Sequence, residues 1–214
     1  SIVPTDGKTP YKPRKIVEAS VDTGSFFEIG HDWGRGIVCG FARLDGYPVG
    51  ILAGDPFFLD GAWTADVCDK VTRHMDLCSQ FHLPVVHFVD CPGFAVGVKA
   101  ETAGVTRAGV RAMTAIYQAD VPVCSVVIRK AYGLAGSAMM NQSRTKWRYC
   151  WPSGDWGSLP MAGGIEAAFR KELAEAEDPE ALKAQLYKKF DAIRSPFRTA
   201  ESFYAEEIID PRDT

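Results

Sequence analysis

Two segments of this sequence place glycines and small residues directly after an apolar run, and both could bind a ligand through the main chain. In the first, residues 89–97 read VDCPGFAVG, so a predicted strand ends near Asp90 and a Pro-Gly turn follows. Gly97 and Gly104 come next, before a predicted helix. In α/β sheets ligands bind beyond the carboxyl ends of strands, and glycine allows close approach to the main chain. This segment predicts a binding loop, with a plain turn as the alternative.

The second segment, residues 129–140, reads RKAYGLAGSAMM and again follows an apolar run. Its small residues from Gly133 onward predict the start of a short helix. The first N–H groups of a helix have no intrahelical acceptor. Together with the positive end of the helix dipole, they can stabilise an oxyanion. The segment therefore predicts an oxyanion site, and a glycine-rich connection without a ligand is the alternative.

Side chains that could act as a nucleophile or a base lack a visible partner in the sequence. Ser137 is not part of a G-x-S-x-G motif, which argues against a serine hydrolase. Cys91 lies in the first segment, but the sequence places no histidine to activate its thiol. His74 interrupts a helical apolar stripe and is expected to pack. Asp90 and Glu101 are the nearest carboxylates for a hydratase-type pair, and no second loop carboxylate is evident.

The two segments need a buried sheet to hold them, and the hydrophobic pattern predicts one. Asp45-Gly46 lies between two apolar runs, which is typical of a hairpin turn. Two later runs are continuous rather than alternating, as expected of strands covered on both faces. The expected strands are Ile37–Leu44, Val49–Ala53, Pro84–Val89 and Pro122–Ile128, and the expected helices are Ala62–Phe81, Val105–Tyr117 and one from Asp178-Pro179 to about Ile193. This order of elements predicts the α/β class.

The composition is that of an ordinary globular protein and excludes several function classes. The 214 residues suit one domain; 46% are hydrophobic, and the net charge is −3 with a pI of about 5.8. No overall basic field is present to attract nucleic acid or an anionic membrane, so neither is expected as a partner. The six cysteines form no CxxC pair, which predicts no metal site and a reducing compartment. No signal peptide or long apolar stretch is visible, so we expect a cytoplasmic protein without a membrane span.

Taken in order, the motifs resemble one protein family. The stretches that carry the likeness include Ile37–Gly46, Pro92-Gly93-Phe94, Arg129–Gly133, Trp151-Pro152 and Ile208–Pro211. They are similar to the carboxyltransferase (beta) subunits of biotin-dependent acyl-CoA carboxylases of the propionyl-CoA carboxylase type. The likeness covers nearly the whole chain and corresponds to the C-terminal half of such a subunit.

The resemblance implies a fold and a set of partners. The fold would be an α/β, crotonase/ClpP-like ββα spiral, with residues 1–214 as a single C-terminal carboxyltransferase domain. The N-terminal, acyl-CoA-binding half is absent from this sequence, so the isolated chain is expected to be inactive. The implied partners are that half, other copies of the subunit, and a biotin carboxylase with its biotin carrier.

The resemblance also implies a chemistry that needs no side-chain base. Carboxybiotin on a carrier domain would give its carboxyl group to the α-carbon of an acyl-CoA, with biotin itself as the base. By the family pattern, the backbone N–H groups of Leu134 and Ala135 form the oxyanion hole for the biotin ureido oxygen. The other residues expected to bind biotin or the substrate are Gly93, Phe94, Gly97, Gly104, Gly133 and Ser137.

Three departures from the family pattern bear on the substrate. Leu134 stands where the family usually has glycine; its N–H group remains, but its side chain needs space and a negative φ. Ser137 stands where the family often has Asp or another specificity-setting residue. Residues 157–164 read GSLPMAGG, where the usual pattern is tighter around a Met-Gly. We therefore expect an acyl pocket that differs from that of a standard propionyl-CoA enzyme.

Other functions stay open at this point. Leu134 and the missing half are compatible with a non-catalytic scaffold subunit of a carboxylase complex. A biotin-dependent acyl-CoA decarboxylase would run the same chemistry backwards, and another crotonase-fold enzyme, such as a hydratase or isomerase, is a further alternative. The aromatic stretch Trp147–Trp156 either lines a subunit interface or packs in the core.

Overall fold

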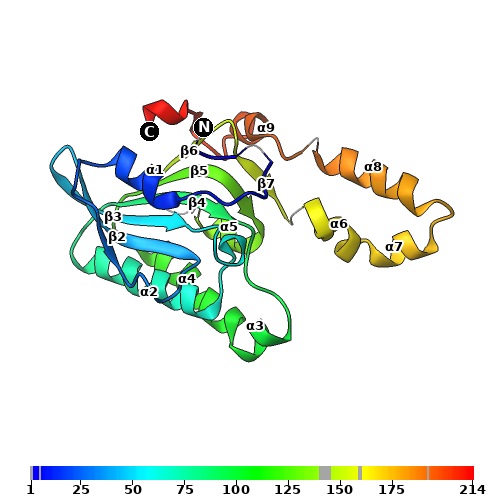
Figure 1. Ribbon diagram of the computed structural model, residues 1–214, viewed down its shortest axis with the longest axis horizontal. Helices are drawn as coiled ribbons and strands as arrows, with labels where there is room; N and C mark the ends of the chain where they lie inside the picture. Colours follow the sequence, from blue (N-terminus) through cyan, green and yellow to red (C-terminus); the bar gives the residue numbers. More distant parts are fainter. Residues whose placement is uncertain (1, 5, 140–145, 159–160, 192) are drawn as a thin grey trace.

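The centre of the molecule is a mixed β-sheet (Figure 1). The computed structural model describes residues 2–4, 6–139, 146–158, 161–191 and 193–214. Within these residues the strands follow the order β1-β2-β3-β4-β5-β6-β8, and β7 pairs with β5. The neighbours among β1, β2 and β3 are antiparallel, and all other pairs are parallel. The strands are β1 Phe27–Ile29, β2 Ile37–Leu44, β3 Tyr47–Gly54, β4 Val85–Cys91, β5 Val123–Tyr132, β6 Lys146–Cys150, β7 Asp155–Gly157 and β8 Glu207–Ile208.

A two-residue turn joins β2 to β3 where the sequence predicted a hairpin. Asp45 and Gly46 both have positive φ, 50° and 81°, as in the type I′ turns that match the twist of a hairpin. The carboxylate of Asp22 holds this turn, because it accepts the N–H groups of both residues at 2.9 and 2.8 Å. The expected strand Ile37–Leu44 is confirmed over its whole length.

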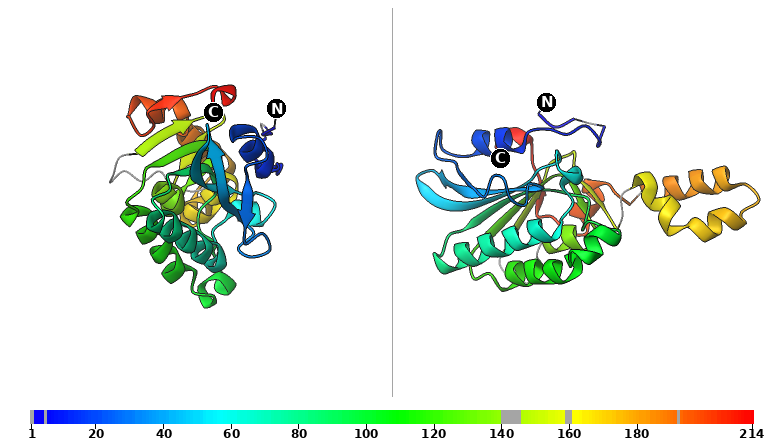
Figure 2. Two further views of the ribbon diagram at one scale, coloured as in Figure 1. Left: turned by 90° about the vertical axis from the view of Figure 1, so that its left-hand side faces the viewer. Right: turned by 60° about the horizontal axis from the view of Figure 1, so that its bottom comes forward.

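Helices cover both faces of the sheet. On one face, α2 (Ala65–Gln80), α4 (Val105–Gln118) and α5 (Gly133–Met139) bury side chains such as Val71 and Ala112 against the strands. On the other face, α1 (Pro13–Ser20) buries Ile16 and Val17. Figure 2 shows α1 and the two chain ends on the opposite side of the sheet from α2 and α4. Because β4 and β5 are covered from both sides, their sequences are continuous apolar runs.

A helical arm extends from this body (Figures 1 and 2). It consists of α6 (Met161–Ala168), α7 (Arg170–Glu175) and α8 (Pro179–Asp191), followed by α9 (Pro196–Glu201) back on the body. The rings of Phe169 and Phe190 lie 5.8 Å apart and pack the arm from within. The N-terminus of α8 is capped as the sequence predicted, because the Asp178 carboxylate accepts the N–H group of Ala181 at 2.9 Å.

Three strands are longer than their apolar runs indicated, and β5 extends furthest at its C-terminal end. The prediction ended β5 at Ile128, but the strand continues to Tyr132 through Arg129 and Lys130. Both charged residues are buried, with 3% and 5% of their surface exposed, and each has a carboxylate partner. A hydrophobic pattern does not show such a continuation, because paired charges look polar in sequence even where they are buried.

Candidate functional site

The two segments singled out in the sequence lie side by side at the carboxyl ends of β4 and β5. Cys91, the last residue of β4, pairs with Ala131 of β5. A Cβ atom added to Gly93 would lie 3.7 Å from the carbonyl oxygen of Tyr132. The loop after β4 and the turn after β5 therefore form one continuous edge. Each of the two segments follows a buried strand, as the sequence predicted.

The loop after β4 is held by Trp63 and Phe94. The Trp63 N–H group donates to the Gly93 carbonyl at 3.0 Å, and the Ala95 N–H group donates to the Trp63 carbonyl at 2.9 Å. The Trp63 and Phe94 rings meet edge to face, with centroids 6.0 Å apart. The Phe94 ring also occupies the space beside Gly109, where an added Cβ would lie 2.8 Å from it. Phe94 thus anchors the loop on α4 through its ring.

Asp90 and its neighbours form a buried network beneath this edge. The Asp90 carboxylate accepts the N–H group of Lys130 at 3.0 Å, the Tyr11 hydroxyl at 2.9 Å and the Arg129 guanidinium at 3.0 Å. Lys130 forms an ion pair with Asp60, in the short helix η1 (Leu59–Gly61). Asp90 is 1% exposed, so its own contacts are shielded from water, whereas the Asp60 side chain is 49% exposed. The carboxylate joins β4 to β5 and has no direct access to a ligand.

The remaining candidate acid–base groups are not available at the edge either. Burial raises the pKa of the Cys91 thiol to about 12, which keeps it protonated. Burial also lowers the pKa of His74 to about 4 and that of His87 to about 3, so both are neutral near pH 7. Glu101 lies exposed on α3 (Val98–Thr102) and accepts the Thr106 hydroxyl at 3.4 Å. What this edge offers a ligand is therefore mainly its backbone.

The turn from β5 into α5 depends on two glycines. Gly133 has φ of 61°, a conformation that glycine adopts without strain. A Cβ added to Gly136 would lie 2.4 Å from the carbonyl carbon of Ala131, so only glycine lets α5 pack this closely on β5. Leu134 is 71% exposed, and it is not among the residues with positive φ. Ala135 is fully buried.

Two of the three departures from the family pattern, Leu134 and Ser137, lie on α5, and both are on its exposed side. Leu134 and Ser137 are three residues apart, so they share one face of the helix, and both are exposed. A ligand approaching the first turn of α5 would meet these two side chains first. Of the third departure, residues 157–164, positions 159 and 160 lie outside the described residues.

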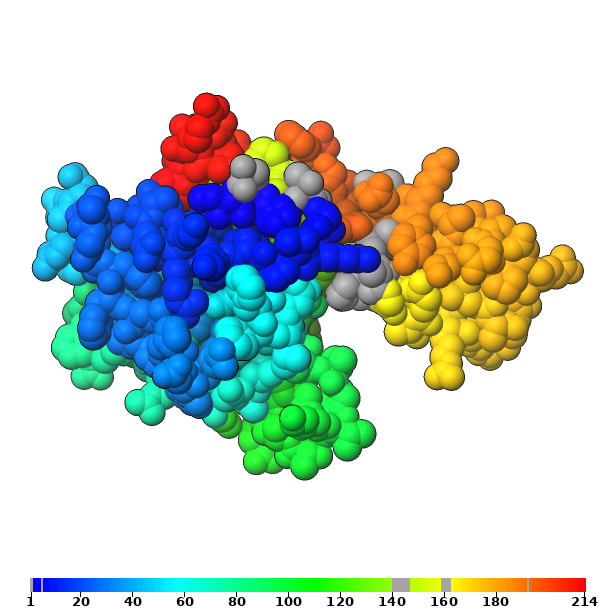
Figure 3. Space-filling view, in the orientation of Figure 1, coloured from blue at the N-terminus to red at the C-terminus, as the bar shows by residue number. Residues whose placement is uncertain are grey.

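Gly97 lies before α3 and Gly104 after it, and both adopt the positive φ angles of the turns there. Their φ angles are 102° and 76°, and a Cβ added to either would meet no atom within 4 Å. Their conformation, rather than a close neighbour, accounts for glycine here. Figure 3 shows α3 projecting from the lower edge of the body and the arm extending to the right, with a notch between them.

Three side chains to which the sequence patterns gave no role lie directly behind the turn. The Tyr132 hydroxyl and the Arg194 guanidinium both bind the Asp155 carboxylate, with Arg194 Nε 2.6 Å from Oδ1. Arg194 Nη2 also lies 3.2 Å from the Tyr132 oxygen. We call these three residues the Tyr132 clasp. They are 23 and 39 residues apart along the chain, and no sequence pattern connects them.

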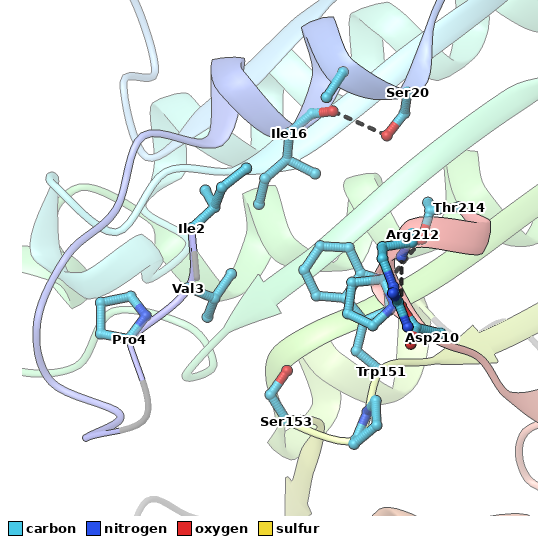
Figure 4. A pocket seen from close by; sticks show the side chains of 13 residues that line it. Ile2, Val3, Pro4, Ile16, Ser20, Trp151, Ser153, Asp210, Arg212 and Thr214 are labelled. Carbon is cyan, nitrogen blue, oxygen red and sulfur yellow. Dashed lines mark hydrogen bonds and ion pairs between the residues drawn. The ribbon is translucent and has the colours of Figure 1, made fainter.

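A cavity of about 810 Å³ lies elsewhere, between α1 and the chain's C-terminal segment (Figure 4). Its lining includes Ile2, Ile16, Trp151 and Arg212. None of the candidate site residues lines it. Trp151 is buried there, whereas Trp147 is 43% exposed, so the aromatic stretch near β6 is divided between core and surface.

Within the described part of the chain, no group of three or more His, Cys, Asp or Glu side chains is arranged to hold a metal ion. Among the helices that the structure describes, none has the length and apolar character needed to cross a bilayer.

Parallel strands end in glycine-containing loops, and a small-residue helix starts at the second of them, as expected of a crotonase-like α/β domain. The solved structure of transcarboxylase 12S, described as a hexamer with methylmalonyl-coenzyme A and methylmalonic acid bound, superposes with a TM-score of 0.91 at 34% identity. It is matched over 100% of this chain and 41% of its own. The family profile described as the carboxyl transferase domain matches residues 1–214. The chain belongs to the carboxyl transferase domain family.

Curated relatives place the chain within longer proteins. The methylmalonyl-CoA carboxyltransferase 12S subunit of Propionibacterium freudenreichii is 35% identical over 100% of this chain and 41% of the relative. The methylmalonyl-CoA decarboxylase subunit alpha of Veillonella parvula is 33% identical, with the same coverage. The chain therefore spans about two fifths of the length of these relatives.

Proposed function

We propose that this chain provides the biotin-facing half of an acyl-CoA carboxyltransferase active site. The protein that carries it would transfer a carboxyl group between carboxybiotin and the α-carbon of an acyl-CoA. The observation that carries this proposal is the edge formed by Gly93 and Gly133. The first turn of α5 begins there, while the nearby Asp90 and Cys91 are buried and engaged. Membership of the carboxyl transferase domain family supports the same reaction class.

The residues at this edge fit the ureido group of biotin. That group has a carbonyl oxygen that needs hydrogen-bond donors, and the N–H groups of Leu134 and Ala135 lie in the first turn of α5, where no intrahelical acceptor exists. When bound, biotin supplies the carboxyl group and the base for the α-proton of the acyl-CoA. The chain's own contribution is to hold the reacting groups in place and to stabilise negative charge through N–H groups.

The other candidate residues differ in how directly they would contact a bound ligand. Gly93 and Gly133 shape the edge, and Ser137 is exposed one turn along α5, where it can contact a bound ligand. Phe94 acts through its anchoring of the loop. Gly97 and Gly104 set the course of α3 and so the outer wall of the notch.

Binding of the acyl-CoA and completion of the site are assigned to parts outside this chain. The chain spans 41% of its 12S relative, and we propose that a second carboxyltransferase half, in other copies of the subunit, holds the thioester. A biotin carboxylase and a biotin carrier would supply the carboxylated cofactor. The 12S structure is described as a hexamer, and an oligomer is proposed here as well.

The direction of the reaction has a second candidate. The Veillonella parvula relative is named as a methylmalonyl-CoA decarboxylase subunit. The same backbone donors would serve removal of the carboxyl group, because forward and reverse reactions pass through the same transition state. A decarboxylase is therefore the alternative to a carboxylase, with the same site residues.

The test is an assay of the full protein that carries this chain, with free biocytin replacing the carrier. Malonyl-, methylmalonyl- and longer carboxyacyl-CoA thioesters are each supplied, and decarboxylation is followed with and without biocytin. Turnover that depends on biocytin supports the proposal, and the preferred thioester identifies the acyl group. A folded protein that binds the biotin carrier but turns over none of them would instead be a scaffold subunit.

A further inference from the structure

The Tyr132 clasp lies at the base of the turn that presents the N–H groups of α5. Tyr132 is the last residue of β5 and directly precedes Gly133. Its backbone pairs with Gly157 of β7, and Lys130 pairs with Asp155. The Trp156 N–H group donates to the Arg194 carbonyl at 3.5 Å. Side-chain and backbone contacts therefore join the same three segments at this one point.

A glycine turn needs such a support if its direction is to be fixed. Gly133 at φ of 61° has no side chain and nearly equal access to other conformations. The orientation of the Leu134 and Ala135 N–H groups then depends on what holds the residues on either side. Close packing of Gly136 on Ala131 holds the helix side. On the strand side the Tyr132 hydroxyl is held by the clasp.

The protonation states of Tyr132 and Arg194 keep the hydrogen bonds of the clasp formed at neutral pH. Burial, together with the hydrogen bond to Asp155, raises the pKa of Tyr132, so its hydroxyl remains a donor. The hydrogen bond to Asp155 raises the pKa of Arg194. The guanidinium binds the carboxylate through Nε and Nη2, and this paired contact fixes orientation as well as distance. Side-chain exposure is 25% for Arg194 and 20% for Asp155, so water has limited access.

We propose that Tyr132, Asp155 and Arg194 are positioning residues for carboxyl transfer. They act through Gly133 to aim the N–H groups of Leu134 and Ala135. The proposal rests on the function proposed above and gives these three residues a role that the sequence motifs did not assign. Oxyanion stabilisation depends on donors that are already in place before charge develops, and small misplacements are costly. Loosening the clasp therefore lowers the rate of the chemical step.

Two conservative variants of the full protein test this. Tyr132→Phe removes only the hydroxyl, and Arg194→Lys keeps the charge but loses the planar fork. Each is expected to lower kcat of biocytin-dependent decarboxylation on the order of ten- to a hundredfold. KM for the acyl-CoA is expected to stay unchanged, because the thioester is assigned to the other half.

The matched control is Arg148→Lys. Arg148 on β6 binds Glu206 through Nη2 at 2.7 Å, with 12% and 25% of the two side chains exposed. It resembles the Arg194–Asp155 pair in chemistry and burial, but β6 pairs with Val123–Val127 near the start of β5, away from the turn into α5, and lies beside β8. Its substitution is expected to lower thermal stability by a similar amount and to leave kcat per folded molecule unchanged.

A second readout does not depend on turnover. Hydrogen exchange of the peptide spanning residues 131–139 is expected to become faster in Tyr132→Phe and Arg194→Lys, and to remain at the wild-type rate in Arg148→Lys. Wild-type exchange in both clasp variants would overturn the proposal, as would kcat losses that the control reproduces. The two tests can fail separately. If the wild-type protein shows no biocytin-dependent turnover but the clasp variants still exchange faster than wild type, the proposed function is refuted while the positioning of α5 by the clasp stands.

Discussion

The guanidinium of Arg129 and the carboxylate of Asp90 form an ion pair of 3.0 Å with 4% and 0% of their side chains exposed. The pair bridges β4 and β5 just below the two loops that form the candidate site. The Arg129 Nη1 atom also donates to the Thr9 carbonyl at 3.0 Å, and Tyr11 donates to Asp90. The N-terminal segment, β4 and β5 are thus tied together at one buried carboxylate.

Loss of this carboxylate's charge is expected to be costly. Asp90→Asn leaves the buried Arg129 guanidinium without its counter-charge, and breaking a buried ion pair from one side costs about 3 kcal/mol or more. Urea unfolding of the two proteins measures the difference. The control is Asp69→Asn, because the Arg111–Asp69 pair is 50% and 43% exposed and is expected to contribute less than about 1 kcal/mol. Equal effects of the two substitutions would contradict the structural role of Asp90.

Gly136→Ala is expected to destabilise the protein although the residue lies within a helix. Alanine normally favours a helix over glycine by about 1 kcal/mol. Here the added Cβ would lie 2.4 Å from a backbone carbon of Ala131, which cannot rotate aside, so overpacking by about 3 kcal/mol outweighs the gain. Thermal unfolding checks the sign. The control is Ser137→Ala, at an exposed position of the same helix, which is expected to leave thermal stability unchanged. A stabilising effect of Gly136→Ala would refute the close packing of α5 on β5.

Much of the fold follows from sequence patterns, and the misses have physical causes. The hairpin at Asp45-Gly46 and the cap at Asp178 were predictable because they depend on local geometry. The strand β7, Asp155–Gly157, is too short to show a periodic pattern. The arm helix α6 has only a weak amphipathic pattern, and α6 and α7 pack on each other and on α8.

The candidate site likewise has features that the sequence predicts and features that it does not. Its two loops could be predicted because each follows a buried apolar strand, and their adjacency follows from parallel pairing of β4 and β5. The Tyr132 clasp and the Asp90 network join residues far apart in the chain. A single sequence contains no signal for such pairings. The roles of Leu134, Ala135 and Ser137 in binding remain predictions.

Leu134→Gly is expected to increase activity. The Leu134 side chain is 71% exposed beside a fully buried Ala135, so it restricts access to the first turn of α5. Glycine removes that obstruction and keeps the N–H group, and kcat/KM for biocytin is expected to rise several-fold, with a stability cost of about 1 kcal/mol or less. Steady-state assays with varied biocytin measure this. The control is Val98→Gly, at a residue 85% exposed on the first turn of α3, which is expected to leave the biocytin kinetics unchanged. A fall in kcat/KM in Leu134→Gly would instead show that the leucine side chain contributes to binding.

The stability of the protein is expected to fall between pH 6.5 and pH 5. Burial lowers the pKa of His74 to about 4 and that of His87 to about 3 in the folded state, whereas both titrate near 6.5 when unfolded. Unfolding therefore takes up protons below pH 6.5. The stabilisation is fully present above that pH and is lost as the pH falls towards the folded pKa values, by about 2 kcal/mol per histidine at pH 5.

Urea unfolding at pH 7 and pH 5 measures this loss. In His87→Gln the difference between the two pH values is expected to be smaller by about 2 kcal/mol. Carboxylates such as Asp210, whose pKa is lowered to about 2 by hydrogen bonds from Arg212, act at lower pH and do not enter this window. An unchanged difference in His87→Gln would mean that His87 is not buried in its neutral form.

The most direct measurement concerns the N–H group of Ala135. Replacing the Leu134–Ala135 peptide bond by an ester removes this one donor and no side-chain atom; an ester before Ala138, whose N–H group lies within α5, is the matched control. In the full protein, the Ala135 ester is expected to lower kcat of biocytin-dependent decarboxylation about 10²–10³-fold, as for loss of one oxyanion donor, while the Ala138 ester retains activity. Equal activity of the two esters and the wild-type protein would contradict the assignment of α5 as the oxyanion site.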